Sequence, residues 1–205
     1  ISEISYERRF WGEGVISIGY RHDEIIGVID QLPLPDGLSA TGNIGDATLD
    51  RLSVNIVIPT DKFGIKGGRF TFKNDWNETH VKDPTTGRDR PISGIRPTQA
   101  NIGFIQDVLS WKTQWGINWL PLLGQGTYGP DQTNVWRGAQ YYEAFAEYKP
   151  TPTLAIRAQL NLWDDFSIRR TVFADRAAPE RTVAFVEDRA INPRTFVTIR
   201  VRKTF

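Results

Sequence analysis

The chain has 205 residues, a net charge of +1 at pH 7, and neither cysteine nor methionine. The missing cysteines exclude disulfides and thiolate metal sites, and the even mixture of charges argues against a nucleic-acid partner. No run of about eighteen apolar residues occurs, so no transmembrane helix is expected.

The chain begins at Ile1 and holds no methionine, so we expect a processed product or a fragment without its signal peptide. Its mean hydropathy of −0.38 is compatible with strands that are apolar on one face only. We expect residues 1–205 to belong to a single domain.

Apolar and polar residues alternate with a period of two in stretch after stretch, which is typical of β-strands with one apolar and one polar face. No segment shows a helical period over three turns, so no helix is expected. The pattern predicts about nine strands. They cover residues 2–10, 15–26, 47–58, 65–81, 98–108, 113–120, 135–148, a strand from 153 onward, and 195–205.

The connections between these strands alternate between short turns and long polar loops. The short turns are 11–14, 59–64, 109–112 and 150–152, and the long loops are 30–46, 82–96, 121–134 and 170–192. Up-and-down membrane barrels sort their connections in this way, with short turns at one end and long loops at the other. Aromatic residues collect near the short turns, as a membrane-interface girdle requires. They are Phe10, Trp11, Phe63, Trp111, Tyr148 and Phe205.

The last strand carries the pattern most clearly. Val197, Ile199, Val201 and Phe205 fall on one face, and mostly polar residues fall on the other. This stretch alone would also fit an edge strand of a soluble β protein. About nine strands is an odd number, whereas bacterial single-chain barrels are even-numbered. We therefore expect an all-β fold: part of an antiparallel up-and-down transmembrane β-barrel, whose C-terminal strands form a curved open sheet.

Several segments resemble TonB-dependent outer-membrane receptors. They are residues 3–10, 83–94, 103–107, 115–119 and 192–205. The resemblance implies a barrel of roughly 22 strands with a plugged lumen, of which this chain would supply the C-terminal portion. It places the short turns in the periplasm and the long loops outside the cell. It also makes Phe205 a signal for barrel assembly.

The resemblance further implies a location in the outer membrane of a Gram-negative bacterium and energised uptake of a scarce ligand, such as a siderophore, cobalamin or glycan. The partners would be outer-membrane lipid, the assembly machinery and the inner-membrane TonB complex. The plug and the TonB contact would belong to an N-terminal part that this chain lacks. Two alternatives stay open: a passive porin-like channel, and a soluble secreted β-sandwich that binds a ligand.

No constellation of residues predicts catalysis, a cofactor or a metal. Residues 124–129 match G-x-G-x-x-G, but no helix follows them, as a dinucleotide site would require. His22 and His80 lack metal-ligand spacing. Asp164 and Asp165 are neighbours on a strand and point to opposite faces, so they cannot converge on one bond. We therefore expect a protein that is not an enzyme.

Two groups of candidate site residues follow from the strand pattern. The first group would line the lumen on three neighbouring strands, where opposite charges can pair across strands. Its members are Glu143, Glu147, Arg157, Arg200 and Arg202. The second group lies at the loops and could contact a small-molecule or glycan ligand by stacking or by charge. Its members are Arg88, Arg90, Tyr128 and Trp136.

Overall fold

The computed structural model describes residues 1–122 and 124–204. The chain is all-β, with 68% of residues in strands and 4% in helices, and its sheets are antiparallel. No helix in the described part of the chain has the length and apolar character needed to cross a membrane. The proposed assembly signal Phe205 lies outside the described residues.

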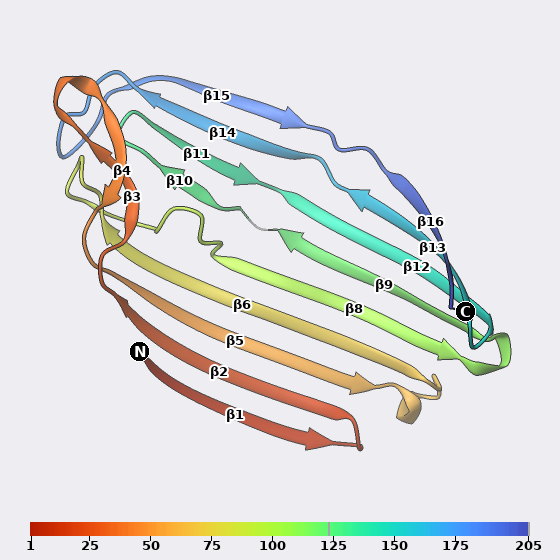
Figure 1. Ribbon diagram of the computed structural model, residues 1–205. Helices are drawn as coiled ribbons and strands as arrows, with labels where there is room; N and C mark the ends of the chain where they lie inside the picture. The colour runs from red at the N-terminus through yellow and green to blue at the C-terminus, as the bar shows by residue number, and fades with distance from the viewer. Residues whose placement is uncertain (123, 205) are drawn as a thin grey trace.

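Nine long strands form one curved sheet in which neighbours along the sheet follow the order of the chain (Figure 1). They are β1 (Ser2–Phe10), β2 (Gly14–Ile25), β5 (Ala47–Pro59), β6 (Gly68–Lys82), β8 (Thr98–Val108), β9 (Thr113–Leu122), β12 (Ala139–Thr151), β13 (Leu154–Trp163) and β16 (Phe196–Lys203). The short β7 (Asp89–Arg90) pairs with the end of β6. The nine predicted strands and their antiparallel arrangement are thus confirmed.

The sheet has two different ends, here called the short-turn end and the loop end. Tight connections join the strands at the short-turn end, two of them as the single 3₁₀ turns η2 (Asp61–Phe63) and η3 (Leu109–Trp111). The C-terminus lies at this end (Figure 1). Every other connection is long and lies at the opposite end of the strands. The predicted sorting of short and long connections is therefore present.

The register places apolar side chains on one face of the whole sheet. Ile18 pairs with both Tyr6 and Val54, and Leu52 pairs with both Tyr20 and Trp76. Many large side chains of this apolar face are exposed. They include Ile4, Tyr6, Ile18, Tyr20, Leu52, Trp76, Ile117, Trp119, Ile156, Val197, Ile199 and Val201. The opposite face is mainly polar, as alternation along each strand requires.

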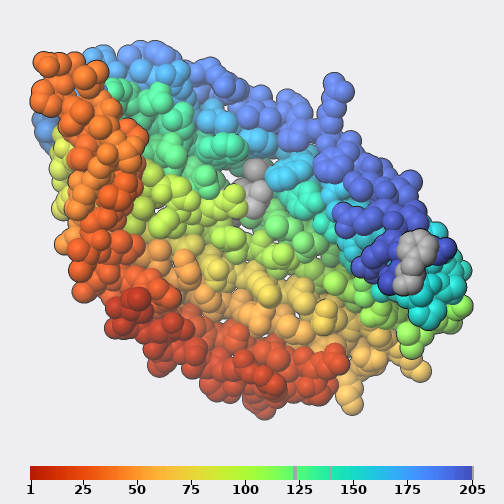
Figure 2. Space-filling model, in the orientation of Figure 1, coloured from red at the N-terminus to blue at the C-terminus, as the bar shows by residue number. Residues whose placement is uncertain are grey.

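Exposure of one sheet face gives the chain a large surface for its mass. Its accessible area is 13002 Å² for 23.3 kDa, whereas a compact monomer of this mass exposes about 9,700 Å². The described sheet ends at β1 and β16, which do not pair with each other, so these residues form an open wall and no closed barrel. Figure 2 shows this wall with the segment around residues 29–43 lying across its loop end.

The long loops contain more strands than the sequence predicts. In the region predicted as loop 30–46, β3 (Ile29–Pro33) and β4 (Ser39–Asn43) form a hairpin around the 3₁₀ turn η1 (Pro35–Gly37). A second sheet contains β10 (Gly126–Tyr128), β11 (Gln132–Arg137), β14 (Phe166–Phe173) and β15 (Val183–Ile191). These four strands adjoin β9, β12, β13 and β16 along the chain and repeat their order, so the second sheet prolongs the wall beyond its loop end.

Two predicted strand boundaries are wrong for local reasons. The stretch predicted as one strand over 135–148 breaks between β11 and β12 at Gly138, whose φ of 78° suits glycine. The strand predicted to begin at residue 65 begins at Gly68 instead. Gly64 and Gly67 both have positive φ, so the turn extends to residue 67.

The small hydrophobic core lies at the loop end. Val28, Ala47, Val81 and Ile92 are buried together there, with Ile25, Ile44 and Ile95 packed around them. Ala47 pairs with Val81 on the polar face of the sheet, on the same side as the pair Arg51 and Asn77. The core therefore covers the loop end of the polar face and leaves the apolar face bare.

Candidate functional site

Hydrogen bonds tie the four long loops into one layer at the loop end. Arg176, from the fourth loop, donates to the backbone oxygens of Gly37 and Leu38 in the β3–β4 hairpin, each at 2.7 Å. The same guanidinium forms an ion pair with Asp131 of the third loop at 2.6 Å. In the second loop, the Gly94 amide donates to the Gly126 carbonyl of the third at 2.8 Å. We call this assembly the loop layer.

Arg90 is the buried charge of the loop layer. Its Nε lies 2.9 Å from Asp83 and its Nη2 lies 3.1 Å from Asp30 of the β3–β4 hairpin. The side chain of Arg90 is 8% exposed, and those of Asp30 and Asp83 are 10% and 5% exposed. Its guanidinium also lies 5.3 Å from the ring centre of Tyr128. The described contacts of Arg90 are therefore internal to the layer, and its proposed contact with a ligand stays a prediction.

Two carboxylates of the loop layer are held in their ionised form. Burial of Asp83 opposes ionisation, but amide hydrogen bonds from Thr86 and Thr85 and the bond from Arg90 outweigh it and lower the pKa of Asp83. The hydrogen bond from Arg176 lowers the pKa of Asp131. Both carboxylates are therefore ionised at neutral pH, as their ion pairs with Arg90 and Arg176 require.

A hollow of about 810 Å³ lies where the wall is incomplete. β8 begins at Thr98, opposite Trp76, so the last residues of β6 have no β8 partner. The segment 91–97 bridges only part of this gap, and we call the remaining hollow the notch. Its wall is formed by Asn77, Glu78, Thr79, His80, Asp89, Arg90, Pro91, Ile95, Pro97, Gly124, Gln125, Gly126, Tyr128, Val135, Trp136, Arg137 and Gly138.

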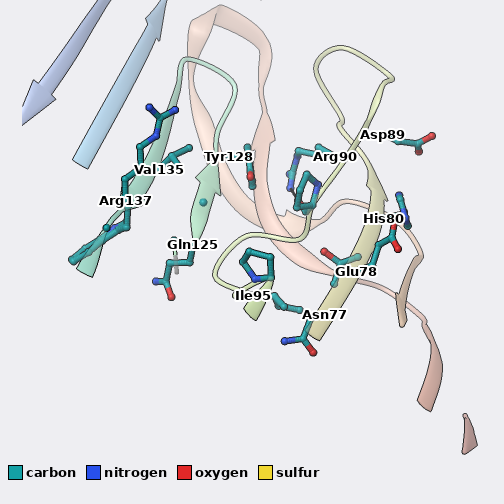
Figure 3. Close-up of a pocket in the computed structure, with 17 residues that line it drawn as sticks. Asn77, Glu78, His80, Asp89, Arg90, Ile95, Gln125, Tyr128, Val135 and Arg137 are labelled. Atoms are coloured by element: carbon teal, nitrogen blue, oxygen red, sulfur yellow. Dashed lines mark hydrogen bonds and ion pairs between the residues drawn. The ribbon is translucent and has the colours of Figure 1, made fainter. Parts of the chain in front are cut away.

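Residues of β6 lie on one side of the notch and residues of the second sheet lie on the other. Figure 3 shows Asn77, Glu78 and His80 across the hollow from Gln125 and Arg137. Neighbouring residues of a strand point to opposite faces. Consecutive residues 77–80 all line the notch, so residues that point to both faces of the wall contribute to its lining.

The notch brings together three of the four predicted ligand contacts: Arg90, whose guanidinium is bonded inside the loop layer, Tyr128 and Trp136. Trp136 is 39% exposed and stacks on Phe166, with ring centres 5.5 Å apart and planes 11° from parallel. Burial raises the pKa of Tyr128, which therefore stays a neutral hydrogen-bonding group at physiological pH. Sequence reasoning missed Asn77, Gln125 and Arg137, because they reach the notch from separate strands.

Arg88 occupies a different place from Arg90. It is an exposed side chain of the second loop, and its ion pair with Glu180 of the fourth loop measures 2.6 Å. Arg88 lines a smaller hollow together with Arg181, whose guanidinium donates to the backbone oxygens of Gly129 and Pro130. Arg88 does not line the notch itself, although its hollow shares Arg90 and Tyr128 with the notch, and its contact with a ligand stays a prediction.

All five predicted lumen-lining residues meet in one hollow on the polar face. The hollow has a volume of about 450 Å³ and is lined by Glu143, Glu147, Ala155, Arg157, Gln159, Arg200 and Arg202. Arg157 forms an ion pair with Glu143 at 3.1 Å and lies 3.7 Å from the ring centre of Phe145. The predicted pairing of charges across β12 and β13 is thus present, while lining of a lumen stays a prediction.

The described residues offer no group of histidines and carboxylates that could hold a metal ion. His22 contacts Asp50 at 2.8 Å, and His80 contacts Glu78 at 3.3 Å. The G-x-G-x-x-G stretch leads into the short strand β10 and then β11, without an intervening helix.

Comparison with known proteins adds no assignment. The chain matches no family model, no curated protein and no solved structure.

Proposed function

We propose that this chain is the C-terminal part of the wall of a TonB-dependent outer-membrane receptor, which takes up a scarce ligand and is not an enzyme. The observation that carries the proposal is the exposed apolar face of the nine-stranded sheet, described above. No segment within residues 1–122 or 124–204 covers this face. Lipid would cover it in an outer-membrane barrel.

The ends of the apolar face support a position in a membrane. At the short-turn end, the rings of Phe10, Trp11 and Phe63 form a chain of contacts with centres 5.1 and 5.7 Å apart. Toward the loop end, Trp119 and Tyr142 stack with their centres 6.2 Å apart. Aromatic girdles at both interfaces are typical of membrane barrels. The nine strands hold 8 to 15 residues, and a membrane-spanning strand needs about 9–11.

The unpaired edges of the sheet support the proposal that this chain is part of a larger barrel. β1 and β16 each have one unpaired side among the described strands, and an exposed edge invites another strand to pair with it. Further strands of the same protein would close the wall. A soluble β-sandwich fits less well, because it would bury the apolar face against a second sheet.

Cysteine labelling tests the proposed orientation, because this chain has no cysteine of its own. Leu38→Cys places a thiol directly after η1 at the loop end, and Lys62→Cys places a thiol within η2 at the short-turn end. In intact cells, a membrane-impermeant maleimide is expected to label Leu38→Cys only. After the outer membrane is permeabilised, it is expected to label both. Labelling of Lys62→Cys in intact cells would contradict the orientation.

A porin-like channel would pass the labelling test, so uptake must be measured separately. Energised uptake is expected to stop in cells that lack the inner-membrane TonB complex. Uptake that continues unchanged in such cells would favour the passive channel.

A further inference from the structure

We infer that the notch binds a neutral carbohydrate within the wall itself. The inference builds on the proposed function only in making this sugar the ligand of the receptor. The binding can be tested on its own. The shape, the aromatic surface and the charge of the notch all fit such a ligand.

The aromatic surface of the notch is held in a fixed position. Trp136 stacks on Phe166, and the Trp136 amide donates to the carbonyl of Gln125 at 3.0 Å. The ring nevertheless stays 39% exposed. A fixed, accessible indole offers a broad apolar surface, and the apolar C–H face of a sugar ring can lie against it.

Planar polar groups also line the notch. Gln125 and Arg137 lie on the second-sheet side of the notch, and Glu78 lies on the β6 side. Asn77, next to Glu78, already accepts a hydrogen bond from Arg51 and donates one to the Arg96 carbonyl. Amide, guanidinium and carboxylate groups together supply both donors and acceptors. A sugar hydroxyl donates one hydrogen bond and accepts others, so it needs such a mixture. The volume of about 810 Å³ falls within the range of about 300–1,000 Å³ that is usual for small-molecule sites.

The charges of the notch argue against an anionic ligand. Its ionised groups are Glu78, Asp89, Arg90 and Arg137, whose formal charges cancel. Arg90 is also committed to Asp30 and Asp83. Arg137 remains the one lining cation with no hydrogen bond or ion pair to the described residues, although it lies near enough to Asp188 to lower the pKa of that group. A site for an anionic chelate needs an excess of positive charge, and the notch lacks one.

Calorimetric titration of the detergent-purified natural protein tests the inference. The neutral probes are maltotetraose, cellotetraose and xylotetraose, and the anionic probe is tetragalacturonate. At least one neutral probe is expected to bind, and tetragalacturonate is expected to bind no more tightly. If no neutral probe binds, or if tetragalacturonate binds more than about tenfold tighter, the inference is overturned.

Variants locate the bound sugar. Trp136→Ala is expected to weaken binding about tenfold or more, and Trp136→Phe is expected to retain most of it. Trp111→Ala removes the same ring from η3 at the short-turn end, where Trp111 is exposed, and is expected to leave binding unchanged. Arg137→Gln, which breaks no hydrogen bond of the described structure, is expected to weaken binding without unfolding the wall. Wild-type affinity in both Trp136→Ala and Arg137→Gln would overturn the location.

The labelling experiment separates failure of this inference from failure of the proposed function. A protein that shows the expected labelling but binds no neutral probe overturns the sugar site alone. A protein that binds a neutral probe through Trp136 but is labelled at both ends in intact cells overturns the membrane orientation alone.

Discussion

The two ends of the wall differ in how their connections are held. At the short-turn end, Trp11, Phe63 and Trp111 remain exposed in turns of a few residues. At the loop end, the connections are long, yet they share a buried core and a buried ion-pair cluster around Arg90. In this chain, therefore, a long loop can be held in place by buried contacts. The long loops hold each other through contacts between segments that are distant in the chain.

The largest effect is expected at the buried charge of the loop layer. Arg90→Ala leaves Asp30 and Asp83 buried without their cation, which costs about 3–5 kcal/mol of stability. Arg88→Ala is the matched control, because its pair with Glu180 is exposed and contributes about 0–1 kcal/mol. Urea unfolding of the two variants in lipid vesicles measures both effects. Equal costs would mean that burial does not distinguish the two arginines.

The next effect distinguishes the two faces of the wall. Ile199→Arg places a charge on the apolar face of β16, and Thr198→Arg places the same charge on the polar face. If lipid covers the apolar face, Ile199→Arg costs about 2–4 kcal/mol near the bilayer midplane. Thr198→Arg is expected to cost much less. Folding titrations in vesicles compare the two variants, and equal values would mean that lipid does not cover this face.

A smaller and more local effect is expected for Arg176→Ala. It removes charged hydrogen bonds to the β3–β4 hairpin and to Asp131, each worth about 1.5–3 kcal/mol at most. The effect is expected to be confined to the loop layer, so amide exchange in residues 34–39 should accelerate while exchange in β5 and β6 stays slow. Arg189→Ala, which lies on the exposed surface of β15, is the control. Equal acceleration throughout the wall would contradict a separate loop layer.

The smallest effect is expected from pH. The pKa of Asp83 is lower in the folded chain than in the unfolded chain, where it is about 3.9. Its contribution to stability is therefore complete above about pH 4 and is lost as the pH falls through the lower, folded pKa. Amide exchange of the loop layer should accelerate over that interval. Asp83→Asn should flatten this pH dependence, and an unchanged profile would assign it to other groups.

The sequence predicts the nine-stranded wall well, because period-two alternation is a local property. The meeting of Glu143, Arg157 and Arg200 also follows from alternation and neighbouring strands, and the structure places them in one hollow. The loop layer could not be predicted in the same way. Arg90 looks like an ordinary loop arginine in the sequence, and only its contacts with Asp30 and Asp83 bury it.

The second sheet was missed for a related reason. In β14, Phe166, Ile168, Arg170 and Val172 occupy every second position and share one face. The polar residues between them and the polar segments on either side are also typical of a loop. Its strand conformation depends on pairing with β11 and β15 on its two sides. The notch could not be predicted from the sequence either. It forms only where β6 and the second sheet face each other, across the gap that remains because β8 begins at Thr98.

The contact of Arg176 with the hairpin also has a consequence for the order of folding. Arg176 lies 137 to 142 residues after its partners in that hairpin. Contacts at such separation form late, after the loop-closure entropy of the intervening chain has been overcome. The hairpin is synthesised well before Arg176, so we expect it to acquire this partner only after most of the intervening strands have folded. Formation of the Arg176 contacts is therefore expected to mark the point in folding at which the two ends of this chain segment have come together.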